Sequence, residues 1–153
     1  MQKVAEEHEA DERKIVQEAV RKIEHREQRK EDLKNLFLNS AQLNEMLASE
    51  PVEASAQALA KWRSLGPLTV EFILNKSNID SLNFEATDLE FKKVYFSYGY
   101  VIGFFKKGTG ISNGICRFVH YKEGIYEGMS KNNGIYAKYS REIYPNGSVK
   151  ETK

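Results

Sequence analysis

The stretch from Tyr95 to Val149 constrains the fold of this chain more than any other part of the sequence. It contains every tyrosine and every glycine except Gly66, interspersed with Phe, Ile and Val. Such residues suit a pleated, half-buried surface, and glycines between them mark turns or bulges. Short runs of this kind, spaced at about ten residues and separated by glycine, predict an antiparallel β-meander.

The predicted strands and turns follow from the same pattern. Asn132-Asn133-Gly134 is a strong hairpin signal, because Asn and Gly tolerate positive φ angles. Other turns are expected over 106–110, 122–124 and 145–148. The strands are expected over residues 94–98, 100–105, 115–121, 125–128 and 135–144.

A second regularity is a period in the twenties. Gly103-x-Phe105-x-x-Gly108 is followed by Gly114, and Tyr126-Glu127-Gly128 lies 25 residues after Val101-Ile102-Gly103. A fixed period of this length is typical of stacked hairpins. The pattern resembles the membrane occupation and recognition nexus (MORN) repeat, whose unit opens with Tyr-Glu-Gly-x-Trp/Phe-x-x-Gly and continues with a paired Gly. The matching positions are Gly103, Phe105, Gly108, Gly114, Tyr126, Glu127, Gly128 and, in the turn between units, Gly147.

The sequence departs from the MORN pattern at several positions. Val101 occupies the tyrosine position of the first unit, and Ser130 occupies the position of the large aromatic residue in the second, which is also several residues short. A third unit stops at its opening turn, with Lys150 in the tyrosine position. The resemblance covers about a third of the chain. It implies an interaction platform, of the kind found in cytoskeletal and ciliary assemblies among others.

Charge is unevenly distributed along the chain. The net charge is −3 over residues 1–50, −1 over 51–94 and +5 over 95–153, for a total of +1. A basic excess this mild does not indicate a nucleic-acid partner. The single cysteine, Cys116, excludes an internal disulfide and suits a reducing compartment. No secretory signal and no apolar run of membrane-spanning length is found, so we expect a soluble intracellular protein, cytoplasmic or cytoskeletal.

Residues 1–49 are predicted to form a charged helical arm. Gln2 to Leu47 contains neither Gly nor Pro and is rich in good helix formers. A helix of this length would extend roughly 65 Å, more than the diameter of a compact domain of this size. Its apolar seam is interrupted between Glu24 and Asp32, which is unfavourable for a dimeric coiled coil. We expect the C-terminal half to pack on a body, and the N-terminal half either to be solvated or to bind a partner. The residues predicted to bind that partner are Ile15, Val16, Val20 and Ile23.

Residues 50–93 are predicted to form a helical platform and a connecting loop. Ser49-Glu50-Pro51 reads as a helix start, and Gly66-Pro67 as its end. A second short helix is expected over Leu68 to Leu74, with a strand as the alternative, followed by turns between Ser77 and Asp88. The apolar faces of these helices, including Trp62 and Phe72, are expected to cover one face of the sheet, with Trp62 in the core.

Catalytic and metal chemistry find little support in the sequence. Cys116 and His120 could share a face of one strand, but a zinc site needs three or four ligands, and no second cysteine exists. We therefore expect a structural cysteine and a surface histidine. The glycine-rich segment 108–114 lacks the Gly-Lys-Ser/Thr ending of a phosphate loop and is interpreted as a hairpin loop. Solvated loop lysines are the default interpretation of the basic hairpin ends. The candidates for contact with an anionic surface are Lys106, Lys107, Lys122 and Lys131.

These observations predict an α+β fold. The helical arm (1–49) and platform (50–93) precede a β-meander over 94–149 and a short tail, residues 150–153. We expect a non-enzymatic scaffold or accessory subunit, without cofactor or metal, that binds protein partners in a larger assembly through its arm and its meander. The alternative is a module that binds phosphoinositides or a membrane surface through the hairpin lysines.

Overall fold

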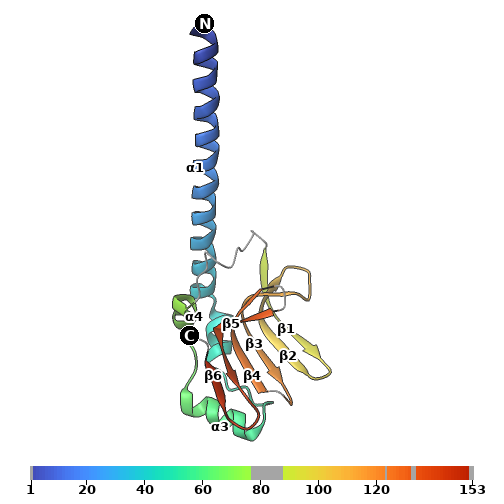
Figure 1. The fold of residues 1–153 in the computed structure, drawn as a ribbon. Helices are drawn as coiled ribbons and strands as arrows, with labels where there is room; N and C mark the ends of the chain where they lie inside the picture. The colour runs from blue at the N-terminus through green and yellow to red at the C-terminus, as the bar shows by residue number, and fades with distance from the viewer. Residues whose placement is uncertain (1, 77–87, 123, 132–133, 152–153) are drawn as a thin grey trace. The chain divides into compact units, whose positions relative to one another are not determined.

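The computed structural model describes residues 2–76, 88–122, 124–131 and 134–151, and divides the chain into two compact units, 1–35 and 36–153. Along the described residues, four helices are followed by six strands (Figure 1). The strands form one antiparallel sheet in the order β1-β2-β3-β4-β5-β6, in which each strand pairs with its neighbours in sequence. The predicted α+β fold with an antiparallel meander is confirmed.

Helix α1 spans Gln2–Asn39 and ends at a serine that starts the next helix. Ser40 is the N-cap of α2 (Ala41–Ala48), and its Oγ accepts a hydrogen bond from the backbone N–H of Leu43 at 3.1 Å. A serine side chain in this role satisfies an amide that the helix leaves unpaired. The long helix predicted from Gln2 to Leu47 is therefore divided at Ser40. Its C-terminal part packs on the body as expected, since Phe37 and Leu43 are fully buried.

The platform contains two further helices, α3 (Ala56–Leu65) and α4 (Val70–Lys76). Helix α3 begins after Ser55, whose Oγ accepts from Ala58 N–H at 3.2 Å, and ends at Gly66, which has a φ of 81°. The predicted start at Ser49-Glu50-Pro51 was wrong, because Ser49 instead caps the C-terminus of α2. The preference for a helix over a strand in α4 is confirmed.

The sheet begins earlier in the chain than the sequence suggested. Its first strand starts at Leu89 and not at Val94. The alternation from Leu89 to Lys92 was overlooked because Lys93 interrupts it with a second charged residue. The signal at 132–133 lies outside the described residues, although Lys131 and Gly134 on either side of it pair in the ladder. The strands are β1 (Leu89–Phe96), β2 (Gly99–Lys106), β3 (Ser112–His120), β4 (Gly124–Lys131), β5 (Gly134–Ile143) and the short β6 (Val149–Glu151).

Two hairpins of the sheet repeat the same close approaches and register shifts 25 residues apart. A Cβ on Gly99 would lie 2.0 Å from the carbonyl oxygen of Val119, and a Cβ on Gly124 would lie 2.0 Å from that of Ile143. Shifts in register follow Gly103 in β2 and Gly128 in β4, whose φ angles are 147° and 155°. Both are values that side chains disfavour. The glycine period in the sequence therefore corresponds to a structural period.

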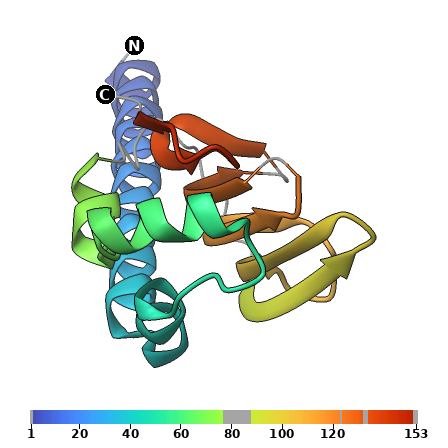
Figure 2. The ribbon, with the colours of Figure 1, turned by 90° about the horizontal axis from the view of Figure 1, so that it is seen from below.

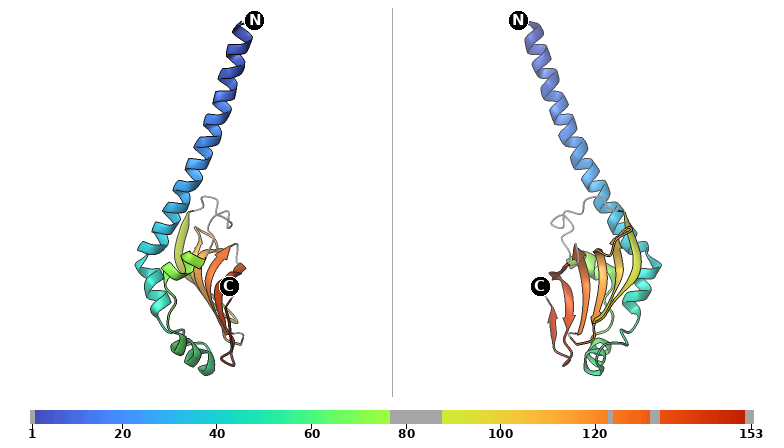
Figure 3. Two further views of the ribbon diagram at one scale, coloured as in Figure 1. Left: turned by 60° about the vertical axis from the view of Figure 1, so that its left-hand side comes forward. Right: turned by 90° about the vertical axis from the view of Figure 1, so that its right-hand side faces the viewer.

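Helices cover one face of the sheet. Within residues 36–153, α2, α3 and α4 (cyan to green) lie along one side of the strands (yellow to red) in Figure 2, and the right panel of Figure 3 shows the other side. A cluster formed by Ala58, Trp62, Ile125 and Ile143 joins α3 to the sheet. Trp62 is in the core as predicted. Phe72, which was expected to cover the sheet, is instead 47% exposed, and α4 buries Val70 and Ile73.

Candidate functional site

A buried cluster of ions lies between the platform and the covered face of the sheet. Glu127 on β4 is fully buried, and its neighbours Arg117 on β3 and Arg141 on β5 are 2% and 4% exposed. Its carboxylate accepts hydrogen bonds from Arg117 Nε (3.0 Å) and Nη2 (2.8 Å), from Arg141 Nη2 (2.9 Å) and from Trp62 Nε1 (2.9 Å). The register places Arg117, Glu127 and Arg141 directly opposite one another, so the two cations flank one anion.

The same arginines bind the ends of two helices. Arg117 Nη2 donates to the carbonyl of Leu47 in the last turn of α2 at 3.2 Å, and Arg141 Nη1 donates to the carbonyl of Gly66, the C-cap of α3, at 2.9 Å. Carbonyls at helix C-termini carry partial negative charge and favour cations. The guanidinium of Arg117 also lies 5.6 Å from the centre of the Trp62 ring. The cluster therefore fixes the platform to the sheet, which is a structural role.

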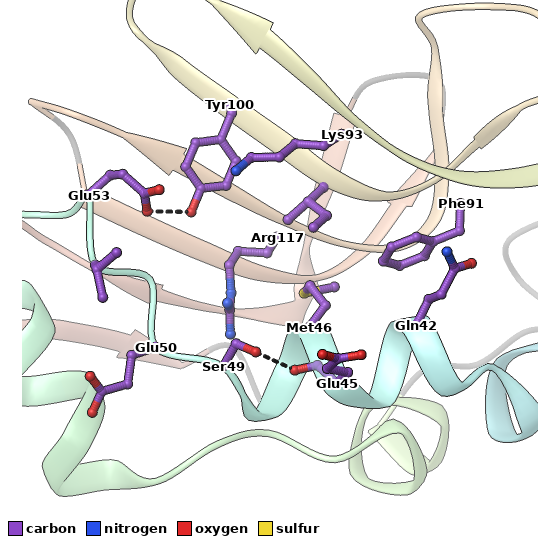
Figure 4. A pocket seen from close by; sticks show the side chains of 12 residues that line it. Gln42, Glu45, Met46, Ser49, Glu50, Glu53, Phe91, Lys93, Tyr100 and Arg117 are labelled. Atoms are coloured by element: carbon purple, nitrogen blue, oxygen red, sulfur yellow. Dashed lines mark hydrogen bonds between the residues drawn. The ribbon is translucent and has the colours of Figure 1, made fainter.

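A cleft of about 370 Å³ opens between α2 and the strands β1 and β2 (Figure 4). On the sheet side, Tyr100 donates its hydroxyl proton to Glu53 at 2.9 Å, and Lys93 Nζ lies 4.1 Å from the centre of the Tyr100 ring. Burial and then the Glu53 carboxylate raise the pKa of Tyr100. We call this hollow the α2–β1 cleft. Its lining comprises Gln42, Glu45, Met46, Ser49, Glu50, Val52, Glu53, Phe91, Lys93, Tyr100, Ile102 and Arg117.

The other face of the sheet carries a second hollow, of about 390 Å³, and half of its lining residues are aromatic. Tyr98 stacks on Phe96 and on His120, with ring centroids 5.5 and 5.2 Å apart. Phe118 and Tyr126 continue the row at 5.8 Å. These rings come from the strands β1, β3 and β4 and from the turn between β1 and β2. The lining is completed by Val101, Ser112, Cys116 and Glu142.

The cysteine and histidine considered as a dyad do share this second face. Cys116 pairs with Gly103 and His120 pairs with Gly99 in the β2–β3 ladder. Cys116 is 1% exposed, and burial raises the pKa of its thiol to about 12, partly offset by a hydrogen bond with Ser130. A thiol with so high a pKa has almost no thiolate at neutral pH, so it is a poor nucleophile. His120 Nδ1 accepts from the backbone N–H of Lys122 at 3.1 Å.

The candidate lysines do not gather at one place. Lys106 and Lys107 lie at the β2–β3 turn, where the backbone N–H of Lys107 donates to Asp88 at 2.9 Å. Lys131 is the last residue of β4 and lies at the same end of the strands as the β2–β3 turn, because Ser130 pairs with Gly114 near the start of β3. Lys122 follows His120, which pairs with Gly99 at the opposite ends of the strands. The register therefore separates Lys122 from the other three.

The residues of the repeat motif mostly have structural roles. Phe105 is 1% exposed, and Gly114 approaches the Phe37 ring so closely that a Cβ would lie 3.0 Å from it. Gly108 and Gly147 lie in turns, with φ angles of 74° and 85°. Tyr126 alone lines a surface hollow.

The four apolar residues of the arm are exposed, as a partner-binding patch requires. The exposed fractions are 67% for Ile15, 61% for Val16, 45% for Val20 and 57% for Ile23. At 100° per residue, the four side chains fall on one side of α1. We call them the arm patch.

The comparisons with known proteins assign no family. No protein-family model, no curated protein and no solved structure matches this chain. Among the described residues, no group of three or more His, Cys, Asp or Glu side chains could hold a metal ion. In the same part of the chain, no helix combines the length and apolar content that a membrane span requires.

Sequence reasoning missed the ion cluster and the α2–β1 cleft. A signal for the cluster exists, because Arg117, Glu127 and Arg141 interrupt strands at positions where alternation calls for apolar residues. The cleft has no comparable signal, since its lining comes from a helix, a connecting segment and three strands.

Proposed function

We propose that this chain is a non-enzymatic scaffold or accessory subunit that binds protein partners through its arm and its sheet, within a larger intracellular assembly. The observation that carries the proposal is the arm patch. Its four branched apolar side chains lie on one face of a charged helix, each at least 45% exposed. Contiguous exposed apolar residues with polar surroundings are typical of protein-binding surfaces.

The sheet supports the same proposal. MORN-like hairpins are our interpretation of its two repeated units, and the matched glycine geometry at Gly99 and Gly124 favours it. The aromatic hollow on the face away from the platform adds a surface of rings, which are enriched at protein interfaces. The single cysteine is consistent with an intracellular location. The alternative, an anionic membrane surface bound by hairpin lysines, has less support because Lys122 lies apart from the others.

The test compares two double variants of the arm. Val16→Glu with Val20→Glu places charge in the arm patch, whereas Gln17→Glu with Arg21→Glu changes charge on the opposite side of α1. All four residues are exposed, so neither variant should alter the fold. The readouts are affinity purification of the tagged chain from its native cells, and light-scattering mass of the purified chain.

We expect stoichiometric partners to co-purify with the wild type and with the Gln17/Arg21 variant, and to be lost from the Val16/Val20 variant. Partners retained equally by both variants would refute a role for the arm patch. An absence of any stoichiometric partner from all three chains would refute the proposed function.

A further inference from the structure

The first strand of the sheet has an edge that pairs with no other described strand. The sheet ends at β1, whose only neighbour is β2. The Lys107 N–H donates to the Asp88 carbonyl at 2.9 Å, and Glu90 pairs with Phe105 two steps further along. Because backbone groups in an antiparallel ladder point alternately toward and away from the neighbouring strand, this bond fixes the pattern along β1. The residues that direct both N–H and C=O away from β2 are Leu89, Phe91, Lys93 and Tyr95.

The outward-facing backbone and the α2–β1 cleft form one continuous surface. Phe91 and Lys93, whose backbone groups face outward, also line the cleft with their side chains. Directly opposite residues of paired strands project to the same face. A segment paired with β1 would therefore place every second side chain over the cleft, beside α2.

The lysines of β1 do not shield this edge. Lysines on an edge strand commonly discourage pairing with another chain. Here Lys92 Nζ contacts Glu90 at 2.9 Å and the carbonyl of Thr109. Lys93 Nζ lies 4.8 Å from the Tyr95 ring and 4.1 Å from the Tyr100 ring. Both ammonium groups are thus held by their own side of the sheet.

The cleft lining determines which side chains would fit there. Glu50 is paired with Arg63 at 2.8 Å, and the charge of Arg117 is compensated by Glu127. The carboxylates of Glu45 and of Glu53, which accepts from Tyr100, line the wall formed by α2 and the segment after it, against the single ammonium group of Lys93. The rest of the lining includes the apolar surfaces of Met46, Phe91 and Ile102. Apolar and basic side chains complement such a lining.

A second copy of this chain would fit less well. In a symmetric antiparallel pair of two β1 strands centred on Lys92 or on Lys93, that lysine would lie directly opposite the same lysine of the other copy. Like charges directly opposite each other destabilise a pair of strands.

We propose that β1 and the α2–β1 cleft bind an extended segment of a partner protein, which adds a strand to the sheet and directs alternating apolar and basic side chains into the cleft. Backbone pairing supplies the affinity and the side-chain sites supply the selectivity. This inference rests on the proposed protein-binding function but uses a different surface from the arm patch.

The experiment selects short random peptides, displayed on phage, against the full-length chain. Selected sequences are synthesised, and their affinities are measured by fluorescence anisotropy. Lys93→Pro removes one outward N–H without removing a bond to β2, a change that edge strands tolerate. Lys93→Ala is its matched control, because it removes the same side chain but keeps the N–H. Glu45→Lys reverses one charge on the cleft wall.

We expect enriched peptides to alternate apolar residues with Lys or Arg. Glu45→Lys should weaken binding by about tenfold or more, as reversal of a charge contact predicts. Lys93→Pro should bind about tenfold or more weakly than Lys93→Ala, because the two variants lack the same side chain and differ in the backbone N–H. Methylation of alternate backbone nitrogens in the peptide should abolish binding. This measurement uses the wild-type chain, so it does not depend on the folding of any variant.

Three outcomes would overturn the inference. The first is that no peptide is enriched, and the second is that the enriched peptides are acidic. The third is that Lys93→Pro binds the peptides as well as Lys93→Ala does and that methylated peptides bind as well as unmethylated ones. A dimer of the chain that peptides dissociate would replace the partner segment by a second copy. Because the Val16→Glu, Val20→Glu variant should bind the peptides normally, failure of this inference and failure of the arm-patch function give distinct results.

Discussion

Replacement of Glu127 by glutamine should cost this protein a large part of its stability. The carboxylate accepts four hydrogen bonds, two of them from Arg117 and one each from Arg141 and Trp62. Glutamine has nearly the same shape, but it carries no charge, and its amide nitrogen cannot accept from a guanidinium. Two arginines exposed by only 2% and 4% would then lack their counter-charge.

The magnitude follows from the cost of leaving buried charges unpaired. Removing one partner from a buried pair typically destabilises by about 3–5 kcal/mol. Domains of this size are stable by roughly 5–15 kcal/mol, so the variant would lose about a fifth of the total at the least and nearly all of it at the most. With a denaturant slope of about 2 kcal/mol/M, the urea midpoint should fall by about 2 M.

Urea unfolding followed by tryptophan fluorescence measures this loss directly. Trp62 is the only tryptophan and contacts the Glu127 carboxylate, so its emission reports the contact between platform and sheet. Circular dichroism at the same urea concentrations reports the helices and strands.

The matched variant replaces all three ions by apolar residues: Arg117→Met, Glu127→Leu and Arg141→Met. Buried ion clusters replaced in this way often lose little stability or gain up to about 4 kcal/mol. We expect the triple variant to be more stable than Glu127→Gln, despite leaving the Leu47 and Gly66 carbonyls without these donors. A loss below about 1 kcal/mol for Glu127→Gln, or a triple variant less stable than the single one, would refute the reasoning.

Three further predictions concern single positions. Gly124→Ala should lower the free energy of unfolding by about 1–3 kcal/mol, because its Cβ would lie 2.0 Å from a carbonyl oxygen of β5, whereas Gly110→Ala, which meets nothing within 4 Å, should be nearly neutral; equal urea midpoints would contradict this. The buried Cys116 thiol, with a pKa raised to about 12, should be alkylated by iodoacetamide only after unfolding in urea, as mass spectrometry will show, and rapid labelling of the native chain would contradict its burial. A hydrogen bond from Arg63 lowers the pKa of Glu50, so the pair contributes stability above the ordinary pKa of a glutamate and loses it as the pH falls through the lowered value. Glu50→Gln should therefore reduce the loss of stability on the acid side, measured as the urea midpoint at each pH. A pH dependence equal to that of the wild type would contradict the pairing.

The part of the fold that the sequence predicted is the part encoded by local signals. The strands observed over 99–106 and 134–143 were predicted over 100–105 and 135–144, because aromatic and branched residues there are bounded by glycines. Gly66 was recognised as the end of α3 because glycine adopts the positive φ that a helix C-cap uses. The arm patch was identified because its spacing follows the helical period.

The parts that were missed depend on contacts between distant segments. The β1 start was missed because Lys93 lies on the same face of the strand as Leu89 and Phe91, so its charge interrupts the alternation of apolar and polar residues. Trp62 and Glu127 meet across 65 residues, and no local pattern specifies that pair. The α2–β1 cleft is likewise defined by segments that only the tertiary fold brings together.

The order of the elements has a consequence for synthesis on the ribosome. Every strand pairs with its neighbour in sequence, so the hairpins can form one after another as the chain emerges. The platform helices emerge before any strand, and the apolar side chains of Leu43, Trp62 and Ile73 that the complete fold buries have no sheet to cover them at that stage. The carboxylate that joins platform to sheet acquires its last arginine only when β5 has been made. The platform is therefore synthesised before the sheet but is fixed to it only after β5 has been made. A nascent chain paused before Arg141 would expose the platform to chaperones and proteases.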